Sequence, residues 1–351
     1  MVGMVLGIIG MIVILQVFGL FEGQKRTTTG GDDAQNSAAI AIDGLQHDIQ
    51  QAGYGVSDIS VLGCHTTITG VSLSLAPVII NPATSIIPAG DAGTDTLLVF
   101  YGNSDGMGQG TVINSSTGAN YQLKIPGAQD FKNGDRVIAA PIVLPPITSA
   151  TACASTLAIQ TASGIDTTTS ILTVASGTAG TGALFNLGPK PQMLAYAIRG
   201  GNLTMCDYGL NNCSVNSAAI WVPIAVGVVS LKAQYGRDTL SPAFTQAQIV
   251  AANAANTLLN YKVDTYDQAT PTTTCGWVRT AAVRLALVAR NGQLEKNDVP
   301  INVSNPPTWD GNTGDPIDLT ADTSWKKYRY KVLQTLVPIR NVAWMGAKAG
   351  C

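Results

Sequence analysis

The side chains that could act as catalysts are few and widely spaced in this sequence. One of the two histidines, His65, follows Cys64 directly, and a thiol beside an imidazole could supply a nucleophile and its base. Successive residues of a strand point to opposite faces, however, so these two side chains would not meet. The other histidine, His47, is expected in solvent or at an interface. Neither histidine lies in a hydrolase or metalloprotease motif, so the sequence predicts no catalytic residue and no enzymatic activity.

Two glycine-rich segments could bind a phosphate group or a metal ion. Residues 105–110 (DGMGQG) lack the strand-to-helix frame of a phosphate-binding loop, which favours a solvent loop. Residues 310–315 (DGNTGD) place oxygen atoms at alternate positions, as calcium loops do, but the closing glutamate is missing. A calcium loop stays open as the less favoured interpretation of this segment. We expect no metal and no cofactor.

The six cysteines favour disulfides over a thiolate metal site, because no C-x-x-C spacing occurs. Two of them stand seven residues apart across a turn-like segment, and the cysteine at the chain end would hold that end in place if it were bridged. The expected pairs are Cys206–Cys213, Cys275–Cys351 and, by elimination, Cys64–Cys153. Such bridges persist outside the cytoplasm.

The first 21 residues form an uncharged apolar segment. About 20 helical residues span the ~30 Å hydrocarbon core of a bilayer, and no basic residue precedes the segment as in a cleaved signal peptide. It could be a membrane anchor, or a helix that leaves the bilayer to pack against copies of itself. Glycines at a G-x-x-x-G spacing favour close helix packing. The residues expected to build this surface are Met1, Gly3, Met4, Leu6, Gly7, Ile8, Met11, Ile14, Leu15, Phe18 and Phe21.

Residues 22–37 contain several glycines and predict a flexible joint, and residues 38–53 predict an amphipathic helix. The apolar face of that helix should dock on a globular domain, whereas Asp43, His47 and Asp48 fall on the polar face. The docking face comprises Ala38, Ile42, Leu45, Ile49 and Ala52. We therefore divide the chain into a helical part, residues 1–55, and a β-rich globular domain, residues 56–351. Short alternating runs, clearest at residues 281–289, predict the strands of that domain.

Several segments, in order along the chain, carry a family resemblance. They include residues 48–54 (DIQQAGY), residues 194–203 (LAYAIRGGNL) and residues 226–238 (VGVVSLKAQYGRD), followed by two strand-like segments at 283–290 and 328–341. Together with the apolar N-terminus, they resemble the PilW family of type IV pilus minor pilins. Family precursors carry a leader, a processing site and an early glutamate. None of these precedes Met1. We expect that the sequence starts inside the mature protein, and the alternative is a subunit that assembles without the ion pair made by that glutamate.

The resemblance implies an α+β, pilin-like fold, in which one long N-terminal helix packs on an enlarged antiparallel β-sheet domain. It implies a subunit that polymerises through its hydrophobic helix, located in the inner membrane before assembly and then in an extracellular filament. Expected partners are identical or homologous pilin subunits and the inner-membrane pilus assembly machinery. A low-copy minor pilin that primes assembly or adheres at the tip, and a type II secretion pseudopilin, are the alternatives.

The composition excludes nucleic-acid binding and fits a crowded assembly. Only 12% of the residues are charged and the formal net charge is −2, so no basic field exists to hold phosphate backbones. A surface of Thr, Ser, Asn and Gly lets like subunits pack without electrostatic repulsion.

Overall fold

The structure is a computed structural model. It describes residues 2–351 except 107, 145–146, 148–152, 154–155, 178, 240–242, 244, 255–261, 301, 303–305, 312–315 and 347, and it leaves out the side chains of residues 2, 5, 6, 20, 22–24 and 26–30. Met1 and the side chain of Leu6, both expected on the assembly surface, lie outside this description. The same holds for most of the calcium-loop candidate, from residue 312 to residue 315.

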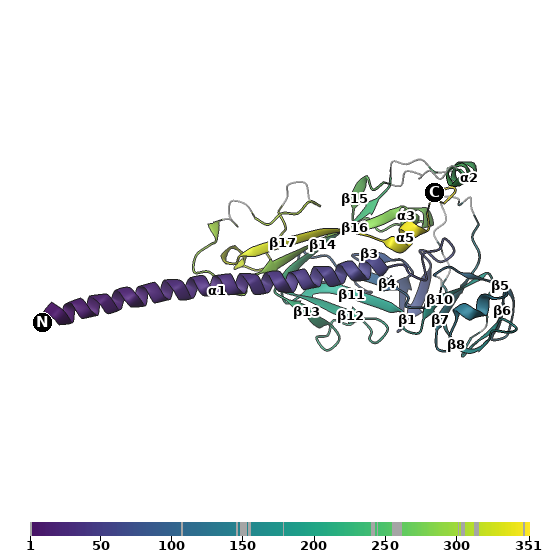
Figure 1. The fold of residues 1–351 in the computed structure, drawn as a ribbon, viewed down its shortest axis with the longest axis horizontal. Helices are drawn as coiled ribbons and strands as arrows, with labels where there is room; N and C mark the ends of the chain where they lie inside the picture. Colours follow the sequence, from purple (N-terminus) through teal and green to yellow (C-terminus); the bar gives the residue numbers. More distant parts are fainter. Residues whose placement is uncertain are drawn as a thin grey trace.

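A single helix, α1 (Val2–Gln51), opens the chain. Its N-terminal part projects away from the rest of the molecule, and its C-terminal part lies along the β-sheets (Figure 1). The helix continues through residues 22–37, the segment predicted as a flexible joint. It ends before Gly53, whose φ of 86° suits a glycine and whose N–H donates to the carbonyl of Phe100 at 2.8 Å.

A five-stranded antiparallel sheet has the order β13-β12-β11-β4-β3. Its strands are β3 (Val78–Ile80), β4 (Leu97–Tyr101), β11 (Gln192–Arg199), β12 (Asn202–Asp207) and β13 (Val222–Val226). The central strand, β11, and its neighbour β4 are almost completely buried, as expected for apolar runs covered on both faces.

A second antiparallel sheet has the order β15-β14-β16-β17. Its strands are β14 (Val228–Arg237), β15 (Thr265–Asp267), β16 (Thr280–Arg290) and β17 (Tyr330–Pro338). In β16, Val283, Leu285 and Leu287 belong to the main core, which also contains residues of α1 and of the five-stranded sheet. Ala286 and Val288 point to the opposite face and pack against Trp309 and Ile317. Both faces of this strand are therefore covered.

Six short strands close into a barrel in the order β10-β5-β6-β9-β8-β7. They are β5 (Thr111–Thr117), β6 (Asn120–Leu123), β7 (Arg136–Ala140), β8 (Ile159–Asp166), β9 (Ile171–Val174) and β10 (Ala183–Gly188). The barrel has a hydrophobic core of its own, which includes Tyr121, Phe131 and Leu172. It forms the end of the molecule farthest from the N-terminus (Figure 1).

Small elements complete the fold. A hairpin joins β1 (His65–Ile68) to β2 (Val71–Ser74), and the short helices are α2 (Gln246–Ala254), α3 (Thr274–Val278) and α5 (Arg340–Trp344). Two single turns of 3₁₀-helix span Gly127–Asp130 and Trp325–Lys327.

The predicted fold class is wrong. The chain is mostly β-structure and 21% helical, and the expected enlarged antiparallel sheet is replaced by separate sheets and a closed six-stranded barrel. The strands within residues 111–188 pair with one another in a closed ring, which leaves no free edge to extend a larger sheet.

The predicted localisation is corrected as well. Among the helices that the structure describes, none contains a stretch long and apolar enough to cross a membrane. This finding overturns the inner-membrane location that was expected before assembly.

Candidate assembly surface on the N-terminal helix

The projecting part of α1 exposes apolar side chains along the part of its length whose side chains are described. Its described large apolar side chains are between 43% (Val17) and 77% (Met4) exposed. They include five consecutive residues, 11–15, so they surround the helix instead of lining one face. The exposed side chains are those of Met4, Ile8, Ile9, Met11, Ile12, Val13, Ile14, Leu15, Val17, Phe18 and Phe21. In globular proteins, a helix that is apolar all round is normally buried.

The glycines of this segment have no packing role inside the subunit. A Cβ atom added to Gly3, Gly7, Gly10 or Gly19 would meet no other atom within 4 Å, apart from the neighbouring helix backbone. Glycine inside a helix costs about 1 kcal/mol relative to alanine, so the subunit alone gains nothing from these residues. Small residues do let two helix backbones approach closely. The glycines therefore suit contacts with other helices.

The docked part of α1 buries one stripe of side chains. Ala38, Leu45, Ile49 and Ala52 are at most 1% exposed, and Ile42 is partly buried at the edge of the same stripe. Ala41 is also buried and was not expected from the sequence. Burial thus follows steps of three and four residues, as a helix lying on a sheet requires.

Asp48, which the sequence places on the polar face of the helix, is half-buried and lies between two tyrosines. Its carboxylate accepts hydrogen bonds from the Tyr101 hydroxyl at 2.8 Å and from the Tyr196 hydroxyl at 2.5 Å. Burial raises the pKa of both tyrosines, and the negative charge of Asp48 raises it further. The two tyrosines belong to β4 and β11, so this polar cluster fixes the rotation of the helix on the five-stranded sheet.

The C-terminal end of α1 is held by two other parts of the chain. Asn341 of α5 donates through its Nδ2 to the carbonyls of Gln51 and Ala52, at 2.9 and 3.1 Å. These carbonyls have no partner inside a helix, so the contact acts as a cap. The hydroxyl of Tyr54 donates to the carbonyl of Gly106 and, at 3.3 Å, to that of Ser104. The projecting helix is thereby anchored rigidly in the domain.

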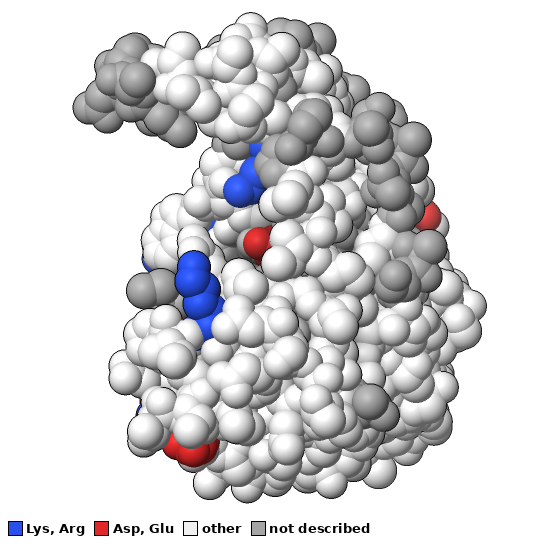
Figure 2. All heavy atoms as spheres, turned by 90° about the vertical axis from the view of Figure 1, so that its right-hand side faces the viewer, with Lys and Arg blue, Asp and Glu red and all other residues white. Residues whose placement is uncertain are grey.

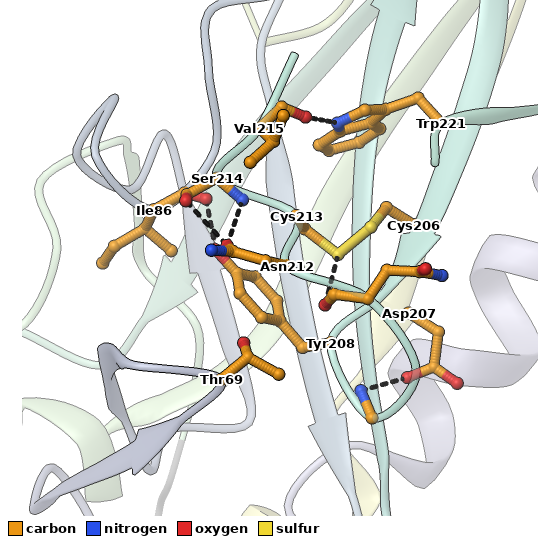
Figure 3. The surroundings of a disulfide bond; sticks show 12 residues. Thr69, Ile86, Cys206, Asp207, Tyr208, Asn212, Cys213, Ser214, Val215 and Trp221 are labelled. Carbon is orange, nitrogen blue, oxygen red and sulfur yellow. Dashed lines mark hydrogen bonds between the residues drawn. A yellow bond between two sulfur atoms is a disulfide. The ribbon is translucent and has the colours of Figure 1, made fainter. Parts of the chain in front are cut away.

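Three disulfides join Cys64 to Cys153, Cys206 to Cys213 and Cys275 to Cys351, which are the pairs named from the sequence. Figure 3 shows the shortest loop, that of Cys206 and Cys213. Within it, Tyr208 donates its hydroxyl hydrogen to the carbonyl of Ile86, and nearby Trp221 donates its indole N–H to the carbonyl of Val215 at 3.1 Å (Figure 3). The Tyr208 contact ties the loop to a distant segment of the domain, and the Trp221 contact closes the segment that follows the loop.

The residues first considered for chemistry are not brought together. His47 is exposed on α1 and makes a hydrogen bond with Gln51 at 2.7 Å, and His65 is exposed in β1. Cys64, beside it, is committed to a disulfide. Within the described residues, no group of three or more His, Cys, Asp or Glu side chains could hold a metal ion.

The barrel end of the molecule has a different surface from the helix. Viewed from that end, most of the visible surface is uncharged, with a few separate basic and acidic side chains (Figure 2). On β5, Asn114, Ser115 and Thr117 are exposed. The visible surface of this end is therefore nearly uncharged, whereas the projecting helix at the opposite end exposes apolar side chains.

Residues 201–341 match a family model described as PilW, Type IV Pilus-assembly protein W. No curated protein and no solved structure matches the chain. The matched segment runs from the β11–β12 turn to the start of α5, and it leaves out α1 and the barrel. The match indicates that the chain takes part in type IV pilus assembly.

Proposed function

Because residues 201–341 place the chain in the PilW family of type IV pilus-assembly proteins, we propose that it is a pilus subunit that polymerises through α1 into a filament. The observation that carries the proposal is the exposure of the apolar side chains on the projecting part of α1.

The energy available from this surface is large enough to drive assembly. Burying ~1,000 Å² of apolar surface yields on the order of 25 kcal/mol before the entropy of association is subtracted. Parallel helices that pack with a constant axial shift form a head-to-tail contact that does not close into a ring. Such contacts generate an open helical polymer. The rigid anchoring of α1 supports this arrangement, because it keeps the domain at a constant position relative to the bundle.

The partners that we propose are identical or homologous pilin subunits, together with the assembly machinery of the pilus. We propose neither a catalytic role nor a nucleic-acid partner. The low charge of the chain, with a formal net charge of −2, supports the exclusion of nucleic acid.

The proposal is tested by placing a charge on the exposed helix. We expect Ile14→Asp, at a residue that is 59% exposed, to leave the domain folded and to lower the amount of chain in sheared filaments at least ~10-fold, since a buried unpaired charge is costly. Leu210→Asp is the matched control, because Leu210 is 66% exposed in the disulfide loop of the globular domain. Wild-type amounts of the Ile14 variant in filaments would contradict the proposal.

A low-copy subunit at the filament tip is the second candidate function. The observation in its favour is the barrel, which lies outside the family match and at the end opposite to α1. Quantitative mass spectrometry of sheared filaments separates the two functions. Many copies per filament support the shaft subunit, and one or a few copies found only at filament ends support the tip subunit.

A further inference from the structure

We propose that the surface around Trp344 is the docking site for the projecting helix of a second copy of this chain, with Phe18 and Phe21 of that copy against the indole ring. The inference rests on the proposed filament function and names the contact that would set the axial shift between neighbouring subunits.

Trp344 differs from the other tryptophans of the chain. Trp221, Trp277 and Trp309 are between 2% and 7% exposed, and Trp325 is partly buried, whereas Trp344 is 79% exposed. An indole ring left in water exposes a large apolar area, and tryptophan is among the residues that contribute most to binding when a partner covers them. The exposure of this one side chain therefore marks a surface that a partner covers.

The surroundings of Trp344 have the form and composition of an interface. The ring borders an open cavity of about 380 Å³ that is also lined by Gln50, Gln51, Tyr54 and Arg340. Trp, Tyr and Arg are the residue types most enriched at interface centres, and the glutamine stems can cover apolar surface. The site is rigid, because Asn341, in the same short helix as Trp344, is hydrogen-bonded to the end of α1.

The position of the cavity indicates that a helix fills it. It begins at Gln50 and Gln51, in the last turn of α1, and α5 contacts the same end of that helix. A second helix that packs parallel to α1, at the usual ~8–10 Å between axes, would reach this cavity as a continuation of the same helix–helix contact. The docking site thus extends the apolar interface that the proposed filament already requires.

The aromatic residues of α1 identify the part of the second copy that docks. Phe18 and Phe21 are the only aromatic residues before residue 38, and they are 69% and 65% exposed. Their spacing of three places both on one face of the helix, where they can pack against Trp344. About 30 residues separate Phe21 from Gln51, so this contact corresponds to an axial shift of ~45 Å between subunits.

A disulfide between copies tests the contact. The described cysteines are all in disulfides, so the full-length double variant Phe21→Cys, Trp344→Cys adds one new pair of thiols. Under oxidising conditions we expect assembled filaments of this variant to yield covalently linked multimers in a non-reducing gel. The control variant, Phe21→Cys with Leu210→Cys, should yield at least ~10-fold less product, because a disulfide needs Cα atoms within about 7 Å. Filaments without the linked product, or with a link to a different protein, overturn the inference.

A second pair of variants tests the contact at Trp344 if the double-cysteine chain does not assemble into filaments. Trp344→Ala should lower the amount of chain in sheared filaments at least ~10-fold, and Trp344→Phe should restore most of it, because an aromatic ring suffices for the contact. Unchanged incorporation of Trp344→Ala overturns the inference while leaving the filament function intact. Absence of the wild-type chain from filaments overturns the proposed function itself, and this inference with it.

Discussion

Asp48 allows the docking of α1 on the sheet to be tested by a single substitution. Its carboxylate accepts hydrogen bonds from the hydroxyls of Tyr101 and Tyr196, and replacing it by alanine removes both bonds. The two tyrosines are 8% and 2% exposed, and both hydrogen bonds are partly buried. We expect Asp48→Ala to loosen the C-terminal half of α1 while leaving the barrel unchanged.

The magnitude follows from the two hydrogen bonds. A hydrogen bond to a charged group contributes about 1.5–3 kcal/mol, and an orphaned buried hydroxyl adds to the loss, so Asp48→Ala should reduce the free energy of unfolding by about 3–5 kcal/mol. Asp48→Asn keeps the volume and one acceptor and should cost about 1–2 kcal/mol. Tyr196→Phe removes the shorter bond and should cost about 1.5–3 kcal/mol.

Hydrogen exchange of the full chain separates the local effect from global unfolding. Amides of residues 38–51 should exchange faster in Asp48→Ala. Amides of β6 and β9 serve as the internal reference, because their buried residues belong to a core separate from that of the helix. Chemical unfolding with intact disulfides gives the overall cost. Unchanged exchange in the helix, together with a loss below about 0.5 kcal/mol, would refute the role assigned to Asp48.

Three further predictions concern the helix, the tyrosines and the disulfides. Leu45→Asp places a charge at a residue that is 1% exposed, so the helix should separate from the domain and the free energy of unfolding should fall by about 4 kcal/mol or more. A normal yield of filaments from this variant would count against the docking face. Burial raises the pKa of Tyr208 to about 12. The contribution of the buried, protonated Tyr208 to the free energy of unfolding should therefore be complete below pH 10.0, the ordinary pKa of tyrosine. It should be lost as the pH rises through about 12. A phenolate absorbance titration with stepwise unfolding measures this, and ionisation of all tyrosines near pH 10.0 in the folded protein would contradict it. Replacing both cysteines of a bridge by serine should lower the free energy of unfolding by about 4 kcal/mol at Cys275–Cys351 and by about 2 kcal/mol at Cys206–Cys213. The bridges span 76 and 7 residues, and a longer closed loop restricts the unfolded chain more. Equal losses in thermal unfolding would exclude this entropic origin.

The helix and its docking face could be predicted because they depend on local periodicity. Ala38, Leu45 and Ile49 recur at helical spacing, and the structure buries them. The alternation in residues 281–289 likewise marked the central strand of the second sheet. The prediction of a flexible joint at residues 22–37 was based on the glycines of that segment, but the backbone of these residues is helical in the structure.

The barrel and the Asp48 cluster depend on contacts between residues far apart in the sequence. No short segment shows that β5 pairs with β10 some 70 residues later, which is one of the contacts that closes the barrel. Asp48 has the spacing of a polar-face residue, and only the positions of Tyr101 and Tyr196 on two strands show that it is hydrogen-bonded to the sheet. In the sequence, the only indication that Asp48 has a structural role is its position in the DIQQAGY segment, which resembles a family motif. Trp344 could not be recognised either, since exposure of a single side chain has no local pattern.

The disulfides also set how far a subunit can stretch when a filament is pulled. Their spans of 89, 7 and 76 residues do not overlap, so together they enclose close to half of the chain. An unfolded residue adds about 3.3–3.6 Å of length, and residues inside a closed loop add almost none. The last loop contains β16, β17 and α5, so the bridge limits how far tension can extend these three elements, two of which are strands of the sheet next to α1. A pulled subunit would therefore lengthen mainly through the segments between the bridges and through α1 itself.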